Sequence, residues 1–284
     1  EVVTATGTED QVGAIPVVLT ASDPNGTIST FRVTTLPTNG TLSLTPGGTA
    51  ITNTTDIPAG GTQTASVTLY FTPTADYSGA PTFQYRATDN SGTNSNTAAG
   101  TITVTAVNDA PVNTLSASYT TAEDTSVKLT GLSIADVDAA GGTMTVTLAV
   151  TNGTLTATSA GGVTVSGSTT SSLQLSGTLA NINAFLLNVA RQPTYVPTSD
   201  FNGAVTLTMT TSDGGNTGTG GTLTDVDTRT ITVSAATDIV ADTVTTNEGT
   251  AITFNAITAA GGGSADNFEN AGRAVTAVTQ GTNG

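Results

Sequence analysis

The stretch Met144-Thr145-Val146-Thr147-Leu148-Ala149-Val150 alternates large apolar residues with smaller ones along its whole length. Successive side chains of a β-strand point to opposite faces of a sheet. The period of two therefore places Met144, Val146, Leu148 and Val150 on one face and the smaller residues on the other. This pattern predicts a strand that buries one face in a core.

The same alternation recurs in several short segments along the chain, and turns rich in Gly, Asn and Pro separate these segments. The further apolar sets are Val67/Leu69/Phe71, Phe83/Tyr85/Ala87, Ile102/Val104/Ala106, Val205/Leu207/Met209 and Ile231/Val233. Many short strands with turns between them are typical of β-sandwiches, whose cores come from two inner faces. We predict an all-β protein of tandem Greek-key β-sandwiches.

One segment, 178–187, departs from the alternation. Leu179, Ile182 and Leu186 fall at helical spacing, and Thr178 is placed to act as the N-cap. We predict a short helix here that covers an open end of the second sandwich. The first repeat has no counterpart of it.

Three kinds of motif recur in the same order and divide the chain into repeats. They are the acidic pairs Glu9-Asp10 and Glu123-Asp124 with the variant Asn247-Glu248, the Thr-Asn-Gly turns at 38–40, 151–153 and 282–284, and the related segments 73–79 and 197–203. The spacing predicts a first repeat over residues 1–107 and a second over 108–237. Residues 238–284 would begin a third repeat that cannot close a core alone. Either the chain is a piece of a longer array, or another chain supplies the missing strands.

Composition excludes several classes of function. The 284 residues contain no Cys and no His, and only six Lys and Arg against 21 Asp and Glu, for a formal net charge of -15. Thiol nucleophiles, imidazole bases and the usual zinc ligands are therefore missing, and we expect no enzymatic activity. The charge argues against nucleic-acid binding, and no apolar stretch is long enough for membrane insertion. Without a visible signal region, we expect Glu1 to begin a processed or partial chain.

The acidic residues gather at loops and repeat boundaries, often beside Asn and Gly, rather than along the strands. Several carboxylates near one point repel one another by about 1 kcal/mol per close pair even in water. A cation would compensate that repulsion. Calcium takes six to eight oxygen ligands and needs neither Cys nor His, so Ca²⁺ is the cofactor that this composition suits.

Several motifs resemble a known family. The segment Val107-Asn108-Asp109-Ala110-Pro111-Val112 resembles the linker between cadherin-like repeats, and Asp136-Val137-Asp138 resembles the paired-acid loop of the repeat that follows. The Glu-Asp-Thr start, the Pro-x-x-Asp-aromatic-x-Gly segments and the Ser-Asp-Gly-Gly loop are similar to the cadherin-like and bacterial Ig-like tandem repeats of large bacterial surface adhesins and biofilm proteins. The resemblance covers about 240 residues.

In cadherin-like arrays calcium lies between successive repeats, and the resemblance implies three groups of ligands. The first junction would use Glu9, Asp76, Asn108, Asp109, Asp136, Asp138 and Asp213. The second would use Glu123, Asp200 and Asp238, although Thr237 replaces the linker Asn there and no Pro follows. Asp23, Asn25 and Asp89 would form a half-site toward a preceding repeat. For Asp76 and Asp200, capping of a tight turn is an alternative role. Asp225 and Asp227 are interpreted as a charged strand end.

Two functional hypotheses follow. In the first, the chain is a calcium-rigidified, non-catalytic spacer or stalk of an extracellular cell-surface adhesin, and its partners are neighbouring repeats. In the second, it is a self-assembling structural subunit of an extracellular filament, sheath or surface layer, in which identical subunits exchange strands. The incomplete third repeat motivates the second hypothesis, because exposed strand edges accept further strands.

Overall fold

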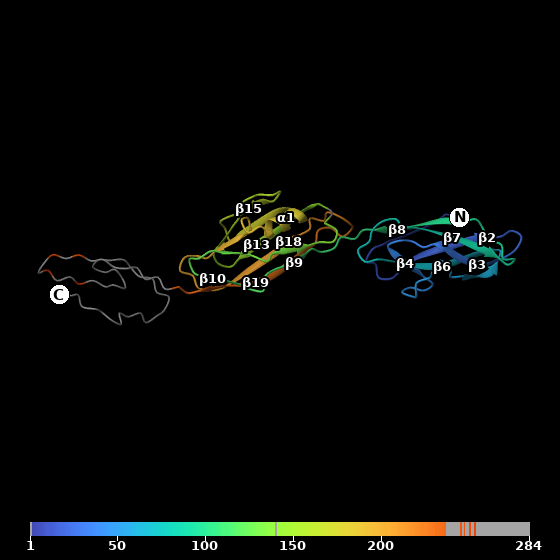
Figure 1. Ribbon diagram of the computed structural model, residues 1–284, viewed down its shortest axis with the longest axis horizontal. Coiled ribbons are helices and arrows are strands. Elements are labelled where there is room, and N and C mark those ends of the chain that lie inside the picture. The colour runs from blue at the N-terminus through green and yellow to red at the C-terminus, as the bar shows by residue number, and fades with distance from the viewer. Residues whose placement is uncertain are drawn as a thin grey trace. The chain divides into compact units, whose positions relative to one another are not determined.

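The computed structural model describes residues 2–139 and 141–236, and residues 245, 247, 250 and 253 beyond them. The predicted third repeat, 238–284, therefore lies almost entirely outside the described residues. The chain forms two compact units, here called the first and the second unit (Figure 1). The first unit comprises Glu1–Ala110 with the loops Asp136–Gly142 and Asp213–Leu223, and the second comprises Pro111–Ala135, Thr143–Ser212 and Thr224–Gly284.

The first unit contains two sheets of antiparallel strands, with one parallel pair at an edge. Their orders are β1-β8-β7-β3-β5 and β2-β6-β4. The strands are β1 (Val3–Thr8), β2 (Ile15–Ser22), β3 (Ile28–Thr35), β4 (Gly40–Ser43), β5 (Ile57–Thr62), β6 (Thr64–Pro73), β7 (Thr82–Asp89) and β8 (Ala98–Thr105). From β1 to β7 successive strands alternate between the two sheets, and β8 then pairs with β7 in the same sheet. This is the Greek-key connectivity of a β-sandwich.

Alternation along each strand builds the core of the first unit. Ile15, Val17 and Leu19 of β2 are completely buried, while the residues between them are exposed. They meet Phe31 and Tyr85 of the other sheet within one hydrophobic cluster. The rings of Phe31 and Tyr85 lie 6.2 Å apart between centroids, which is a favourable distance for a tilted aromatic pair.

The second unit repeats this plan with more elements. Its sheets have the orders β10-β19-β18-β13-β16-β15, β11-β17-β14 and β12-β9. The elements are β9 (Val112–Thr114), β10 (Tyr119–Ala122), β11 (Val127–Lys128), β12 (Ser133–Ala135), β13 (Thr143–Val150), β14 (Thr154–Thr156), β15 (Thr164–Ser166), β16 (Ser172–Thr178), α1 (Leu179–Leu187), β17 (Thr194–Val196), β18 (Gly203–Ser212) and β19 (Thr224–Ser234). Met144, Val146, Leu148 and Val150 of β13 are buried, as their alternation predicts.

The predicted helix is confirmed as α1. Thr178 is its N-cap, and the hydroxyl of Thr178 accepts a hydrogen bond from the backbone N–H of Asn181 at 3.3 Å. Ile182, Phe185 and Leu186 are buried on one side of the helix, which lies against β12 and β16. Among the residues that the structure describes, no helix is long and apolar enough to cross a membrane.

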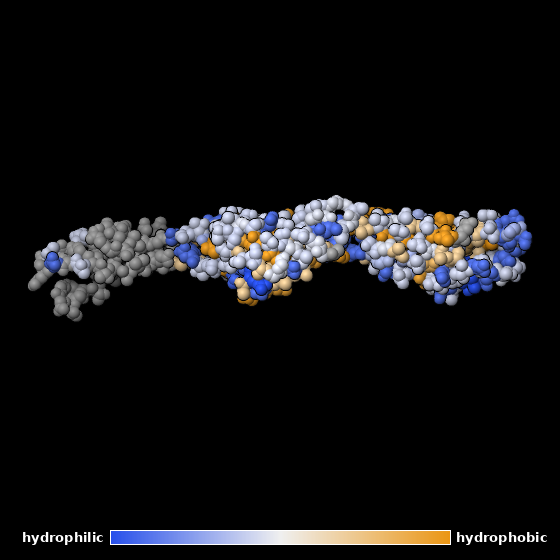
Figure 2. Space-filling model, turned by 90° about the horizontal axis from the view of Figure 1, so that it is seen from above, coloured by the Kyte–Doolittle hydropathy of each residue, from blue (hydrophilic) through white to orange (hydrophobic). Residues whose placement is uncertain are grey.

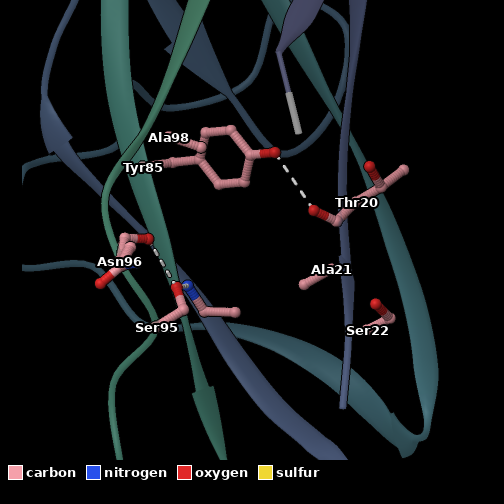
Figure 3. A pocket seen from close by; sticks show the side chains of 8 residues that line it. Thr20, Ala21, Ser22, Tyr85, Ser95, Asn96 and Ala98 are labelled. Atoms are coloured by element: carbon pink, nitrogen blue, oxygen red, sulfur yellow. Dashed lines mark hydrogen bonds between the residues drawn. The ribbon is translucent and has the colours of Figure 1, made fainter. Parts of the chain in front are cut away.

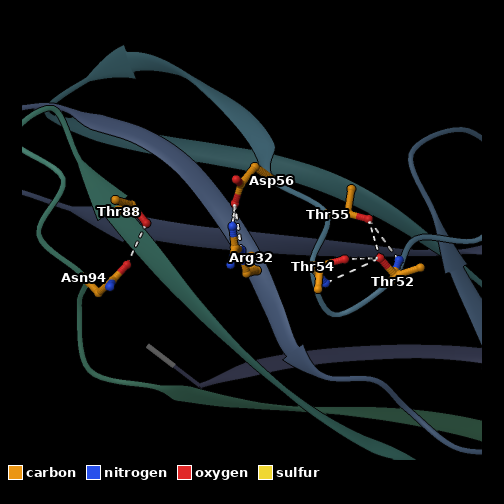
Figure 4. A network of polar contacts seen from close by, with 7 residues as sticks. All are labelled: Arg32, Thr52, Thr54, Thr55, Asp56, Thr88 and Asn94. Atoms are coloured by element: carbon orange, nitrogen blue, oxygen red, sulfur yellow. Dashed lines mark hydrogen bonds and ion pairs between the residues drawn. The ribbon is translucent and has the colours of Figure 1, made fainter.

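The outer faces of the strands are mostly polar, and Figure 2 shows separate hydrophobic patches among hydrophilic residues on the face it presents. Threonine and the few charged side chains form short-range contacts on these faces (Figure 4). Arg32 of β3 pairs with Asp56 at 2.5 Å, but both side chains are partly exposed. Such a surface ion pair contributes little to stability, so the fold depends on its two cores.

Candidate metal site

Glu9 is fixed by the parallel pairing of β1 with β8. Because the two strands run side by side to Thr8 and Thr105, the chain after β8 passes directly beside Glu9. The Glu9 backbone N–H donates to the carbonyl of Thr105 at 3.1 Å, and the Glu9 Oε1 atom accepts from the N–H of Val107 at 2.8 Å. Only 3% of Glu9 is exposed. Its second oxygen, Oε2, is buried and has no hydrogen-bond partner in the part of the chain that the structure describes.

Asp10 and Asp76 both adopt the left-handed backbone conformation, with φ angles of 43° and 57°. Asp tolerates this conformation better than most residues with a Cβ atom, because its short polar side chain bonds locally. The two turns bring the carboxylates of Asp10 and Asp76 together with that of Asp109, and one oxygen from each lies within 4.8 Å of the others.

Asp109 stands at the centre of the acidic group. Its backbone N–H donates to Oδ2 of Asp138 at 3.0 Å, while its own Oδ2 is buried and finds no hydrogen-bond partner among the residues that the structure describes. Burial raises the pKa of Asp109, and the carboxylates of Asp10, Asp76, Asp138 and Glu9 raise it further. All four of these neighbouring charges are negative.

Asn108 and Asp213 form a second part of the same site. The carboxamide nitrogen of Asn108 donates to Oδ2 of Asp213 at 2.5 Å and to the carbonyl of Gly221 at 2.9 Å. Burial opposes ionisation of Asp213, but the hydrogen bonds from Asn108 and from the N–H groups of Gly215 and Leu223 outweigh it and lower its pKa. Both side chains are at least nine-tenths buried. The Oδ1 atom of Asn108 has no hydrogen-bond partner within the described ranges 2–139 and 141–236.

The loop 136–138 carries two more carboxylates. The N–H of Asp138 donates to Oδ1 of Asp136 at 3.1 Å, and Oδ2 of Asp136 is buried with no hydrogen-bond partner in the described part of the chain. Burial, followed by interactions with Asp138, raises the pKa of Asp136 to about 6, and Asp213 adds to the effect. The hydroxyl of Thr217 donates to the carbonyl of Asp138, which ties this loop to the loop 213–223.

Part of this group lines a cavity of about 310 Å³ within the first unit. Its walls include Glu9, Asp76, Asp109, Asp138 and Thr217. The linker that carries Asn108 is held against the loop 213–223, because Asn108 N–H donates to Thr219 and Thr219 N–H donates to Ala106. The structure thus brings together all seven residues predicted for the first junction.

Asp10 was not among the predicted ligands, although the recurrence of Glu9-Asp10 as Glu123-Asp124 was visible in the sequence. The repetition of the pair, rather than of Glu alone, was the signal that could have found it. The pairing of Asn108 with Asp213 spans 105 positions. No local sequence pattern predicts that contact.

The second unit reproduces part of this arrangement around Glu123. Oε1 of Glu123 accepts from the N–H of Ala236 at 2.5 Å, and Asp124 and Asp200 have left-handed φ angles of 56° and 59°. The N–H of Asp200 donates to the Asp124 carboxylate at 3.3 Å. Asp238 lies outside the described residues, so the predicted second site stays a prediction.

The third predicted group is more exposed and is largely satisfied by its own loops. Asp23 and Asp89 line one cavity of about 220 Å³. Oδ1 of Asp23 accepts from the N–H of Asn25 at 3.0 Å. Hydrogen bonds from Ser91, both side chain and backbone, and from Thr93 lower the pKa of Asp89. The predicted half-site of Asp23, Asn25 and Asp89 stays a prediction.

No protein-family model and no curated protein matches this sequence. Among solved structures, the chain is similar to the extracellular cadherin domains 1–4 of protocadherin gamma B7, with 14% identity over 82% of this chain and a TM-score of 0.38. It is also similar to domains EC1-2 of human mucin-like protocadherin, with 15% identity over 83% of this chain, 96% of that chain and a TM-score of 0.35.

A third similar structure is an endo-fucoidan hydrolase of glycoside hydrolase family 107, with 18% identity over 80% of this chain and a TM-score of 0.22. The matches span 48% of the protocadherin gamma B7 chain and 32% of the hydrolase chain. The strand pairing within each unit, and not these similarities, defines the β-sandwich fold.

Proposed function

We propose that the first unit binds calcium through Glu9, Asp10, Asp76, Asn108, Asp109, Asp136, Asp138 and Asp213. The observation that carries the proposal is a set of buried side-chain oxygens that have no hydrogen-bond partner among the described residues: Glu9 Oε2, Asn108 Oδ1, Asp109 Oδ2 and Asp136 Oδ2. A buried polar atom without a partner costs about 1–3 kcal/mol, and more when it is charged. A bound cation could coordinate several of these oxygen atoms together.

The electrostatics of the group also favour a cation. Two unit charges 4 Å apart repel by about 1 kcal/mol in water and about 4 kcal/mol where the effective dielectric constant is near 20. The carboxylates of Asp10, Asp76 and Asp109 meet at comparable distances, and further acids act on Asp109. Binding of a divalent cation would turn this repulsion into attraction.

The ligand chemistry selects calcium among the common metals. All the side chains offer oxygen, as hard cations prefer, and the sequence has no Cys or His for zinc or copper. Magnesium demands a tighter octahedral geometry and retains its waters. A large group of carboxylates and one carboxamide, carried by several loops, suits the higher and less regular coordination of calcium.

We propose that the chain as a whole is a non-catalytic extracellular spacer of a cell-surface adhesin, stiffened by calcium. Asn108 and Asp109 belong to the linker, and Asp136, Asp138 and Asp213 belong to loops that follow it in the sequence. Calcium would fasten the linker to those loops, while its removal would leave carboxylates that repel one another. The support is the site geometry together with the linker and loop motifs.

The test is a calcium titration of the whole chain by calorimetry, with small-angle scattering in calcium and in chelator. We expect saturable binding and a longer, stiffer particle in calcium. The double variant Asp136→Asn and Asp138→Asn should lose most of the binding heat and the change in scattering. The proposal fails if calcium up to several millimolar gives neither binding heat nor a change in scattering.

The filament hypothesis depends on residues 238–284, nearly all of which lie outside the described residues. Electron microscopy of the same samples distinguishes the filament hypothesis from the spacer hypothesis, because only the filament hypothesis predicts ordered polymers formed by the chain alone.

A further inference from the structure

The second unit contains a cavity of about 290 Å³ that two basic side chains line. They are Lys128 of β11 and Arg191 of the turn that follows α1. The remaining walls are small or polar: Thr156, Ala157, Thr158, Ala160, Ser168, Ala190, Gln192 and Thr194. We propose that this cavity, here called the basic cavity, binds an acidic sugar unit, whose carboxylate or sulfate group pairs with Lys128 and Arg191.

The small sheet β11-β17-β14 presents Lys128 to the basic cavity. Lys128 pairs with Thr194, and Thr194 pairs with Thr156, so their side chains lie in one row across the three strands. Tyr195 and Leu155, one position along their strands, are completely buried, so that row faces the core instead. The ammonium group of Lys128 donates to Oγ1 of Thr194 at 3.4 Å. The strand pairing therefore fixes where this positive charge lies.

The turn after α1 brings Arg191 to the same cavity. The backbone N–H of Arg191 donates to the carbonyl of Asn188 at 2.8 Å. The next residue, Gln192, is only 6% exposed, and its carboxamide donates to the carbonyl of Leu186 at 2.8 Å. The guanidinium group lies against Gly161, because a Cβ atom there would be 2.6 Å from Nη1 of Arg191. Hydrogen bonds thus hold the turn, and a glycine leaves room for the end of the side chain.

The charges at the basic cavity are positive and unbalanced. Among the residues that the structure describes, no Asp or Glu lines it. Within the described ranges the one ion pair joins Arg32 to Asp56 in the first unit, so neither Lys128 nor Arg191 has a carboxylate partner there. Two of the six basic residues of a chain with a formal net charge of -15 therefore line one cavity without a counter-charge. Both would attract an anionic group.

The walls also define what carries the anionic group. The guanidinium fork of arginine binds carboxylates and similar oxyanions through two parallel hydrogen bonds, and lysine adds a point charge. Hydroxyl groups donate and accept hydrogen bonds, which suits the hydroxyls of a sugar ring. Four residues of this kind line the cavity: Thr156, Thr158, Ser168 and Thr194.

The size of the basic cavity limits the bound part of the ligand. Its volume of about 290 Å³ is at the low end of ligand cavities, which run from about 300 to 1,000 Å³. We therefore expect one sugar ring to enter. Ala190 and Arg191 are exposed, so the rest of a polysaccharide could continue into solvent.

The first unit has the corresponding sheet without the basic side chains. The sheet β2-β6-β4 corresponds to β11-β17-β14, because β6 and β17 each lead into a Pro-x-x-Asp segment. Tyr70 of β6 pairs with Pro16 and with Ser43, so the row that contains Lys128 in the second unit contains no basic residue here. The elements described for the first unit include no helix, and hence no counterpart of the turn that carries Arg191.

Another cavity of the first unit provides a comparison of similar size. Figure 3 shows its walls, and its volume is about 310 Å³. The hydroxyl of Tyr85 donates to the carbonyl of Thr20 at 3.1 Å. Polar side chains line this cavity too, but none of its described wall residues is charged: Thr20, Ala21, Ser22, Tyr85, Ala87, Ser95, Asn96 and Ala98. We therefore expect an acidic sugar to bind at the basic cavity and not there.

The test uses the whole chain, freed of calcium and dialysed into a chloride buffer without phosphate, sulfate or chelator, because common chelators are themselves polycarboxylates. A galacturonate trimer, a neutral galactose trimer and sodium sulfate are titrated separately at equal ionic strength, and backbone amide resonances are followed by NMR. With the galacturonate trimer we expect saturable shifts at residues 128, 156–160 and 190–192, and none at residues 95–98. The neutral trimer should bind about tenfold more weakly or not at all, and sulfate should bind more weakly than the galacturonate trimer.

Three variants make the test specific. Arg191→Gln and Lys128→Gln should each weaken binding of the galacturonate trimer by about tenfold or more, as expected when a hydrogen bond to a charged group is lost. Arg229→Gln is the matched control, since it removes the same charge from β19 of the second unit outside the walls of the cavity, and it should leave binding unchanged. Because Arg191 is exposed, its variant keeps the test decisive if Lys128→Gln fails to fold.

The proposal is overturned if the galacturonate trimer gives no saturable shifts at several millimolar, if the neutral trimer binds equally well, or if Arg191→Gln binds like Arg229→Gln. Sulfate that binds as tightly as the trimer would show that the cavity takes a free anion only, and would overturn the choice of a sugar. The proposed calcium ligands lie in the first unit and the samples contain no calcium, so none of these results bears on calcium binding.

Discussion

The carboxylate of Glu9 accepts a hydrogen bond from the backbone N–H of Val107 at 2.8 Å, across 98 positions of the sequence. Glu123 makes the same contact with Ala236, across 113 positions. In both units a buried glutamate thus holds the first residues that follow the last strand. The contact uses one carboxylate oxygen and fixes the position of the whole side chain.

Glu9→Gln should weaken calcium binding by about tenfold or more, because it removes one charge while keeping the size of the side chain and an oxygen for Val107. Calorimetry on the whole chain measures the effect. The matched variant Glu123→Gln changes the equivalent residue of the second unit and should leave the site around Asp109 intact. Equal effects of the two substitutions would contradict the ligand role of Glu9.

Asp10→Asn tests the ligand that sequence reasoning missed. Asn tolerates the left-handed φ of 43° as Asp does, so the turn should persist and the melting temperature in chelator should not fall. Removing the charge relieves repulsion with Asp76 and Asp109, but it should weaken calcium binding severalfold. Asp124→Asn is the control in the second unit. Unchanged affinity for the Asp10→Asn chain would remove Asp10 from the site.

Gly218→Ala should disturb the site through the backbone alone. Gly218 has a φ of +78°, and a Cβ atom there would lie 2.5 Å from the backbone of Val107 and of Asn108. The substitution is therefore strained and pushes the linker away from its loop. We expect weaker calcium binding with the β-sheet circular dichroism retained. Gly221→Ala is a useful comparison, since it has a positive φ but nothing near the added atom.

The raised pKa of Asp136, about 6, predicts two opposite dependences on pH. Calcium competes with the proton on this group, so its affinity should fall by about tenfold between pH 7 and pH 5. In chelator the sign reverses, because a folded-state pKa above the model value of 3.8 contributes stability that is present below that value and lost as pH rises through about 6. Asp136→Asn should flatten both trends, as measured by calorimetry and thermal unfolding. A trend that persists in the variant would belong to other groups.

Thr178→Ala should destabilise the second unit by about 1 kcal/mol, the usual contribution of a helix N-cap. The hydroxyl of Thr178 accepts from Asn181, and alanine offers no acceptor. Denaturant unfolding measures the change. Thr170→Ala, a nearby turn substitution outside the helix, is the comparison for a general loss of threonine hydrogen bonds.

The strands and the helix could be predicted because their signals are local. Burial at Met144, Val146 and Leu148 follows from a period of two, and α1 follows from its cap and from the spacing of Leu179, Ile182 and Leu186. The acidic site was predicted only as a group of residues. Its geometry depends on the parallel register of β1 with β8, which brings Glu9 to Val107 and which no stretch of sequence reveals.

The same limit applies to Asp225. Its position in β19 agrees with the interpretation as a charged strand residue, but its carboxylate receives the backbone of Asn113. That contact joins positions 112 apart and depends on where β9 lies. The burial of Asn113 could not be predicted from the sequence either, because an Asn in a short polar stretch is ordinarily exposed.

The left-handed aspartates have a consequence for how such a chain can change over time. At Asp10, Asp76, Asp124 and Asp200 the backbone shape and the negative charge are separate properties of one residue. Exchange of Asp for Asn keeps the shape and deletes the charge. In evolution, one Asp-to-Asn substitution could therefore abolish cation binding at one site while another site and both sandwiches stay unchanged. Arrays that bind cations at some sites and not at others would then differ from one another by single substitutions.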